Sequence, residues 1–285
     1  MPFPPDVFLI GAQKAGTTTL ATLLDRHPGI TLASPKEPHY LTGNRERGLD
    51  WYRQCFRGPE DSLFLDASPS SANAPLDATG AAARSPRAGV PERLEALNPD
   101  ARLIYLLRDP VARTYSAYWH QVRNGEERRT FGEAVRRDGA FLAASDYAAQ
   151  LDRYLPYFGL ERFLILRFED LRRDPEGAAN ACFDFLGLAT LDLGEAAATA
   201  RNPSYTYNRA GQALVRAVPG KGGLKAASRL ARRVLPARAY AAAGRLFTER
   251  VPPMGANDRA WLEDRFRPRN RAFRELTGIT TGYPE

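Results

Sequence analysis

The sequence predicts an α/β protein with a mostly parallel central β-sheet flanked by helices. Short apolar runs rich in β-forming residues recur at residues 7–10, 63–65, 102–107 and 163–167. Stretches with helical spacing separate these runs, and such alternation is typical of parallel sheets. The chain has 285 residues, 44% of them hydrophobic, which is enough for a single domain with a sizeable core.

The first predicted strand ends at Gly11 and leads into a helix predicted over residues 17–26. The intervening loop has the glycine spacing of a Walker A loop, but Thr17 stands where the lysine belongs and Lys14 lies inside the loop. Glycines such as Gly16 let backbone N–H groups converge on an anion, and the start of a helix favours negative charge. We therefore expect a P-loop-like sheet whose first loop binds a 5′-phosphate.

The remaining elements continue the alternation. Helical spacing recurs at residues 48–56, 111–121 and 258–276. Asp109 is the expected N-cap of the middle helix and Pro110 its first residue, while Gly278 ends the last helix. Residues 70–87 are rich in Ala, Ser, Pro and Gly, and they predict a loop or a short irregular helix.

Arg108 stands at the carboxyl end of the predicted strand 102–107. Ligands of open α/β sheets bind at that edge. Ser116 lies about two turns into the following helix, so it can meet the same anionic group as Arg108. An arginine before a helix is also common as a structural ion pair, and the motif alone leaves that alternative open.

Charge is unevenly distributed along the chain. The formal net charge is +7, but residues 201–250 hold 11 Lys or Arg and the single acid Glu249, a local charge of +10. This basicity indicates an anionic partner. We expect a core over about residues 5–190 and a basic helical C-terminal part over about 200–285, with small helices between Arg201 and Arg250. That part is either a solvated surface or a loop that closes over nucleotide phosphates.

Cysteine and hydropathy patterns exclude several classes of protein. Cys55 and Cys182 are the only cysteines and form no CxxC pair, which argues against a disulfide framework and against a Cys/His metal site. The first residues show no signal-peptide pattern, and the longest apolar runs are far shorter than a membrane-spanning helix requires. We expect a cytoplasmic protein without an integral membrane segment.

Together these motifs resemble those of sulfotransferases that use 3′-phosphoadenosine 5′-phosphosulfate (PAPS). In that family a loop of the form QKAGTT, here residues 13–18, resembles the 5′-phosphosulfate-binding motif, and Arg108 with Ser116 match the pair that holds the 3′-phosphate. The segment Lys36-Glu37-Pro38-His39 points to the branch of heparan sulfate and other carbohydrate sulfotransferases. Further similarities lie at residues 35–40, 48–53, 66–69, 167–171 and 276–278.

The resemblance implies a role for each matched residue. Lys14 would donate a proton or hydrogen bond to the bridging oxygen as the S–O bond breaks, and Glu37, with His39 as the alternative, would accept the proton of the acceptor hydroxyl. Glu37, His39 and Ser68 would contact the acceptor, and the reaction would need no metal. The donor would be bound by Gln13, Ala15, Gly16, Thr17, Thr18, Thr19, Arg108, Ser116, Arg209, Lys221 and Gly222.

The acceptor and two competing functions stay open at this point. A carbohydrate or glycolipid hydroxyl is favoured, but a lipid, polyketide or other natural-product alcohol fits the same chemistry. Ala67 stands where relatives carry a lysine, which favours a less anionic acceptor. The rival functions are a P-loop nucleotide kinase that uses Mg²⁺ and a polyanion-binding module without turnover. We expect no nucleic-acid partner, and the sequence carries no signal for an oligomeric state.

Overall fold

The computed structural model describes residues 3–59, 61–76, 84–195, 205–208, 246 and 248–285. Five parallel strands form the central sheet in the order β2-β3-β1-β4-β5. They are β1 (Val7–Gly11), β2 (Ile30–Leu32), β3 (Leu63–Asp66), β4 (Arg102–Leu107) and β5 (Phe163–Arg167). The four predicted strands and the parallel sheet are confirmed. The sequence analysis missed β2, because three residues are too few to show a periodicity.

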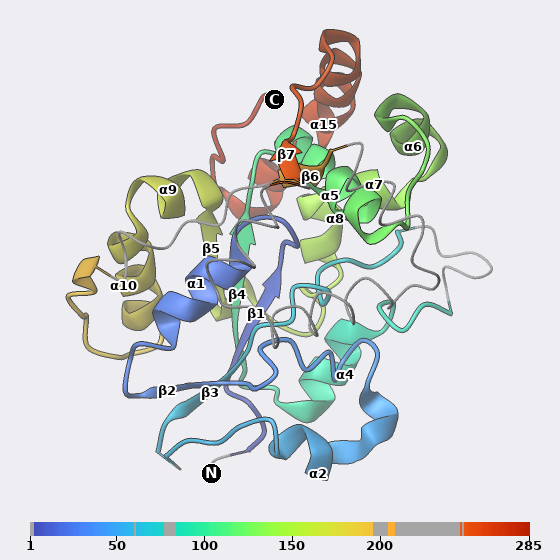
Figure 1. Ribbon diagram of the computed structural model, residues 1–285. Helices are drawn as coiled ribbons and strands as arrows, with labels where there is room; N and C mark the ends of the chain where they lie inside the picture. Colours follow the sequence, from blue (N-terminus) through green and yellow to red (C-terminus); the bar gives the residue numbers. More distant parts are fainter. Residues whose placement is uncertain (1–2, 60, 77–83, 196–204, 209–245, 247) are drawn as a thin grey trace.

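The strand order places a topological switch point at the centre of the sheet. β1 pairs with β3 on one side and with β4 on the other (Figure 1). After β1 the chain forms β2 and β3 on one side of β1, and it then forms β4 on the other side. In open α/β sheets, ligands bind outside the carboxyl ends of strands at such a switch point. The loops that follow β1 and β4 are thus side by side.

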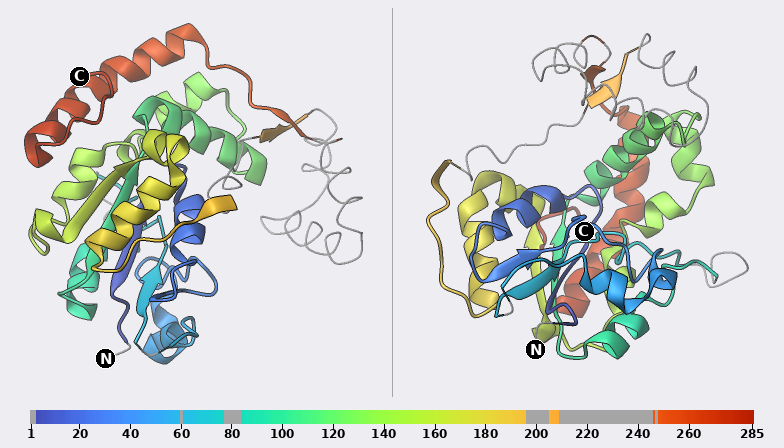
Figure 2. Two further views of the ribbon diagram at one scale, coloured as in Figure 1. Left: turned by 90° about the vertical axis from the view of Figure 1, so that its left-hand side faces the viewer. Right: turned by 60° about the horizontal axis from the view of Figure 1, so that its bottom comes forward.

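Helices cover both faces of the sheet. α1 (Thr17–Leu24), α9 (Phe168–Arg173) and α10 (Pro175–Phe185) pack together on one face, and α5 (Pro110–Asn124), α7 (Ala140–Ala143) and α8 (Tyr147–Asp152) lie on the other (Figures 1 and 2). Shorter or peripheral elements are η1 (Arg45–Arg47), α2 (Gly48–Arg53), α4 (Val90–Leu97), α6 (Phe131–Arg137) and η2 (Leu160–Arg162).

The helix boundaries follow local signals. The Asp109 carboxylate accepts hydrogen bonds from the backbone N–H groups of Val111 (2.8 Å) and Ala112 (3.3 Å), and Pro110 opens α5, which confirms the predicted cap. The last predicted helix is α15 (Ala256–Thr277), which ends at Gly278 with a positive φ of 70°.

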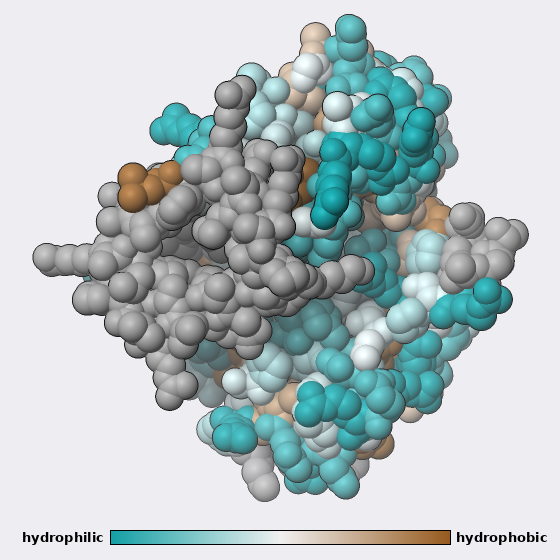
Figure 3. All heavy atoms as spheres, turned by 45° about the vertical axis from the view of Figure 1, so that its right-hand side comes forward, coloured by the Kyte–Doolittle hydropathy of each residue, from teal (hydrophilic) through white to brown (hydrophobic). Residues whose placement is uncertain are grey.

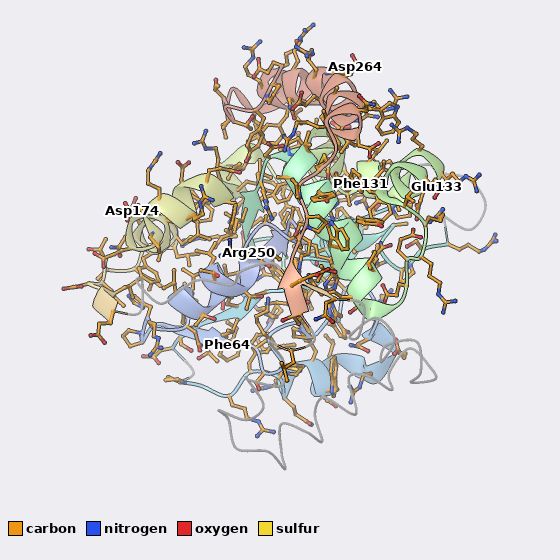
Figure 4. All side chains as sticks on the ribbon, turned by 45° about the horizontal axis from the view of Figure 1, so that its top comes forward. Phe64, Phe131, Glu133, Asp174, Arg250 and Asp264 are labelled. Carbon is orange, nitrogen blue, oxygen red and sulfur yellow. The ribbon has the colours of Figure 1, made fainter. Side chains whose placement is uncertain are left out.

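A second hydrophobic cluster joins α15 to the domain. Phe131 on α6 points toward α5, where its ring lies edge-on to Tyr115 at 4.8 Å between centroids (Figure 4). Leu262 and Phe266 of α15 belong to the same buried cluster, and α15 also packs against α8 (Figure 2). The described part of the C-terminal third therefore shares a core with the helices that follow β4.

Between Arg201 and Arg250 the expected small helices lie largely outside the described residues. The described parts include a short antiparallel pair, β6 (Tyr205–Tyr207) and β7 (Thr248–Arg250), which the sequence analysis did not expect. Residues 70–76 and 84–87 form no helix or strand, as predicted for this loop.

The described surface is mostly hydrophilic on the face shown in Figure 3, where it is hollowed between the upper and lower parts of the molecule. Within the described ranges, no helix combines the length and the apolarity needed to cross a bilayer. Cys55 and Cys182 are both buried and unbridged.

Candidate functional site

The loop between β1 and α1 packs so closely against α9 that only glycine fits at the last position of the loop. Gly16 has a φ of 93°, and a Cβ atom there would lie 2.8 Å from Cδ2 of Phe168. The backbone N–H of Ala15 donates to the carbonyl of Ala12 at 3.0 Å, which closes the turn before the helix. Gly16 has no side chain to cap α1, so the first N–H groups of this helix, from Thr17 onward, remain donors for an anion.

Two arginines hold the backbone of this loop: Arg108, directly after β4, and Arg113, on α5. Arg108 Nη1 donates to the carbonyl of Lys14 at 3.1 Å, and Arg113 Nε donates to the carbonyl of Gln13 at 3.0 Å. Arg113 is only 2% exposed and also contacts Ser145 Oγ at 3.1 Å. All these acceptors are neutral, although the carboxylates of Glu169 and Asp109 act on Arg108. Arg113 is buried and its contacts with Gln13 and Ser145 carry no negative charge, which favours an anionic ligand nearby.

The sequence analysis assigned no role to Arg113, although a signal for one was present. It lies three residues before Ser116, so the two side chains share a face of α5. Ser116 itself is 8% exposed. The structure therefore brings Arg108 and Arg113 to the glycine loop, and Ser116 lies on the face of α5 that carries Arg113.

Lys14 carries the titratable side chain of the loop, and its pKa is strongly perturbed. Burial lowers its pKa to about 8, and repulsion by Arg123, Arg108 and Arg113 lowers it in the same direction. The Glu37 carboxylate acts against these effects. The loop lysine and the predicted base, 23 positions apart in the sequence, therefore lie within electrostatic reach of each other.

Around Glu37, the predicted acceptor residues form a hydrogen-bonded group. Glu37 Oε1 pairs with Lys36 Nζ at 2.9 Å, and Glu37 Oε2 lies 3.4 Å from His39 Nε2. On the other side of the ring, His39 Nδ1 contacts Ser70 Oγ at 2.9 Å, while the backbone N–H of His39 donates to Ser68 Oγ at 3.1 Å. The structure thus joins Glu37, His39 and Ser68 and adds Ser70, which the sequence analysis did not single out.

A buried carboxyl group lies behind this hydrogen-bonded group. Asp66, at the end of β3, is 2% exposed, and its Oδ2 accepts a hydrogen bond of 2.6 Å from the Tyr52 hydroxyl. Oδ1 has no hydrogen-bond partner within the described part of the chain. Burial raises the pKa of Asp66, while the Ser68 and Tyr52 hydroxyls and the charge of His39 oppose the rise.

Asp66→Asn is expected to stabilise the fold relative to wild type increasingly as the pH rises. The folded pKa of Asp66 lies above its unfolded value, so wild-type stability is lost as the pH rises from about 4 through the folded pKa. Asparagine cannot ionise, so the variant does not lose this stability as the pH rises. The gain relative to pH 4 should reach about 1.4 kcal/mol per unit of pKa shift. Denaturant unfolding at pH 4 and pH 7 measures it, and a pH-independent difference would contradict the buried carboxyl.

The other predicted donor residues fall into two groups. Thr17 is buried at the start of α1, Thr18 is exposed and Thr19 is half-buried, so the three hydroxyls face different surroundings. Arg209, Lys221 and Gly222 lie outside the described residues, and their contacts with a donor stay predictions.

Comparison with known proteins agrees with this geometry. The sulfotransferase domain family matches residues 4–209, which contain the glycine loop, the Glu37 group and Arg108. The chain belongs to this family. Human heparan sulfate glucosamine 3-O-sulfotransferase 6 is 32% identical to this sulfotransferase over 193 residues, 65% of the chain and 52% of that protein. A bifunctional heparan sulfate N-deacetylase/N-sulfotransferase from Drosophila melanogaster is 32% identical over 210 residues, 66% of the chain and 20% of that protein.

The sulfotransferase chain therefore spans about half the length of the first relative and a fifth of the second. Among solved structures, a sulfotransferase from Alicyclobacillus acidocaldarius matches 97% of the chain and 96% of its own with a TM-score of 0.65 and 23% sequence identity. That match shows a shared fold, with the helices and the central sheet described above.

Proposed function

We propose that this protein transfers a sulfuryl group from PAPS to a hydroxyl group of a carbohydrate. One observation carries the proposal: Lys14, in the loop after β1, lies within electrostatic reach of the Glu37 carboxylate and of Arg108, Arg113 and Arg123. A cation for the leaving oxygen and a base for the attacking hydroxyl are the two groups that such a transfer requires. Membership of the sulfotransferase family supports the assignment.

The residues present suit a polyanionic donor. The N–H groups at the start of α1 and the hydroxyl of Thr17 would hold the 5′-phosphate, and Arg108 with Ser116 would hold the 3′-phosphate. Arg113 would act through the loop backbone, since its guanidinium binds the Gln13 carbonyl. The bound donor supplies the sulfuryl group, and the protein supplies the charges that keep it in place.

Lys14 and Glu37 would divide the proton chemistry. Glu37 accepts the proton of the acceptor hydroxyl as its oxygen bonds to sulfur, and Lys14 donates to the phosphate oxygen that leaves as the other S–O bond breaks. The products are a sulfate ester and 3′-phosphoadenosine 5′-phosphate (PAP). Lys14 and Glu37 both follow the carboxyl ends of strands, β1 and β2, and an in-line transfer would use them on opposite sides of the sulfur atom.

A carbohydrate acceptor is supported by the names of the two relatives, both heparan sulfate enzymes. The Lys36 ammonium lies 3.3 Å from the Ala67 carbonyl but pairs with Glu37, so it adds no uncompensated charge beside Ala67. This agrees with an acceptor less anionic than a sulfated glycan. A natural-product alcohol would use the same two catalytic groups and is the second candidate.

Calorimetric titration with PAP in EDTA tests the donor site. We expect wild type to bind PAP without metal and more tightly than it binds ATP with Mg²⁺. Arg108→Ala should weaken PAP binding about 10- to 100-fold, because a charge-assisted contact to a phosphate is lost. Arg259→Ala, on the far α15, is the matched control and should bind like wild type. Tighter binding of Mg-ATP would favour the kinase alternative.

Three further expectations accompany the proposed function. Metal independence is tested by turnover in EDTA. The single-domain arrangement over residues 1–285 is tested by limited proteolysis. A cytoplasmic location is tested by cell fractionation.

A further inference from the structure

One face of α5 carries a polar stripe that extends beyond the predicted donor residues. Arg113, Ser116, His120 and Arg123 follow one another at intervals of three, four and three residues, which places them on one side of the helix. The stripe begins at the glycine loop, where Arg113 binds the Gln13 carbonyl. It ends in the last turn of α5, before Gly125 reverses the chain with a φ of 73°.

The last residue of the stripe is fixed in place. Arg123 Nη2 lies 3.4 Å from His120 Nδ1, and Asn124 Nδ2 lies 3.3 Å from the other ring nitrogen of His120. The Arg123 side chain is half-buried. The carboxyl end of a helix favours a positive charge, so the last turn of α5 is a suitable position for this guanidinium.

Arg123 lies on the face of α5 that carries Arg113, which binds the glycine loop, and it is within electrostatic reach of Lys14. Among the charged groups that shift the pKa of Lys14, Arg123 has the largest effect, and it lowers that pKa. Arg108 comes second, although its guanidinium binds the carbonyl of Lys14 itself. Arg113 and Glu37 complete the set of charges that act on Lys14. Two cations that face each other across a site repel, and an anion between them converts the repulsion into attraction.

The anion that belongs at this position follows from the other contacts. Arg108 and Ser116 are assigned to the 3′-phosphate and the start of α1 to the 5′-phosphate, so the group next to Lys14 is the sulfuryl group. Its three outer oxygens keep a negative charge while sulfur moves between two oxygens. A planar guanidinium with several donors suits such a group better than an ammonium does.

We propose that Arg123 donates hydrogen bonds to the sulfuryl oxygens of the bound donor, opposite Lys14, and is a further catalytic residue of the proposed transfer. The inference rests on the proposed function. It adds a contact made by the last turn of α5 and directed at the sulfuryl group, whereas Arg108, Ser116 and the start of α1 hold the nucleotide.

Arg123→Gln tests the proposal against binding of PAP, which lacks the sulfuryl group. We expect kcat to fall about 100-fold, the usual cost of one lost donor to developing charge. The Kd for PAP should change less than about threefold, because no phosphate contact is lost. If PAP binding weakens as much as kcat falls, Arg123 binds a phosphate and the proposal is wrong. It is equally wrong if kcat stays at the wild-type value.

The pH profile adds a readout that a purely structural role would not move. In wild type, kcat/KM for the donor should fall as the pH rises through about 8, where free Lys14 loses its proton. Arg123→Gln removes the strongest repulsion on Lys14, so the alkaline limb of the profile, where kcat/KM falls, should move to higher pH. A limb that stays at the wild-type pH would overturn the placement of Arg123 beside Lys14.

Two controls separate this inference from the proposed function. Arg128→Gln removes the same charge from an exposed residue five positions further on and should leave kcat, the PAP Kd and the pH limb unchanged. Wild-type binding of PAP in EDTA shows that the donor site exists independently of Arg123. A wild type that binds PAP and turns over, together with an unaffected Arg123→Gln variant, would sink this inference alone.

Discussion

Lys14→Met should abolish turnover and at the same time make the fold more stable. The ammonium is held in a half-buried loop among three arginines, which lowers its pKa to about 8. That arrangement suits a proton donor to a leaving oxygen, and its loss should lower kcat by about 10³-fold. Methionine has a similar length and no charge, so it removes the repulsion. We expect the free energy of unfolding at pH 7 to rise by roughly 1 to 3 kcal/mol.

The pH dependence of this gain distinguishes charge from packing. The folded pKa of Lys14 lies below its unfolded value, so between about 8 and 10.5 the unfolded chain binds the additional proton. Wild-type stability therefore rises with pH across that window. The advantage of Lys14→Met should be largest below pH 8 and shrink toward pH 10.5. Denaturant titrations at pH 7 and pH 10 measure the difference.

Lys14→Arg is the matched control for both effects. It keeps a full positive charge but is a poor proton donor because of its high pKa. We expect turnover to stay low and the stability gain to be absent. If Lys14→Met were no more stable than wild type at pH 7, the ammonium would not be in the crowded cationic environment that the structure shows. Retained turnover in the methionine variant would exclude Lys14 as the proton donor.

Glu37→Gln is expected to lower kcat by about 10² to 10⁴-fold while the PAP Kd stays near wild type. The sequence left Glu37 and His39 open as alternative bases, and the geometry favours Glu37. The Glu37 carboxylate raises the pKa of Lys14, whereas His39 lowers the pKa of the buried Asp66. Each carboxylate oxygen of Glu37 also keeps a second lone pair beyond its contact with Lys36 or His39.

His39 has less capacity left for a substrate proton. Its Nδ1 is engaged by Ser70 and its Nε2 faces Glu37, and a neutral imidazole has one acceptor nitrogen. We therefore expect His39→Gln to lower kcat only about tenfold, through a less well-oriented Glu37. Steady-state assays on the two variants, with PAP titration as the check on folding, measure the contrast. A larger loss in His39→Gln than in Glu37→Gln would make His39 the base.

Short-range signals account for the parts of the site that the sequence predicted. The tight turn at Gly16, the Asp109 cap and the opening Pro110 depend on backbone preferences of residues next to one another in the chain. The position of Arg108 at the carboxyl edge of the sheet, the edge that also carries the glycine loop, was predicted too. It needs only that both follow strands of one parallel sheet, because all carboxyl ends of such a sheet lie at the same edge.

The α/β class, the loop that holds Lys14 and the place of Arg108 at the carboxyl edge of the sheet follow from the residues read in order along the chain. The contact of Arg113 with the loop, that of Ser70 with His39 and the electrostatic effect of Arg123 on Lys14 depend on how the chain folds. These interactions join residues 31 to 109 positions apart. Periodicity assigns each residue to a strand or a helix face, but many strand orders satisfy the same periodicity. Packing of the whole chain around one core decides which faces meet. This packing brings the charged residues of the site together.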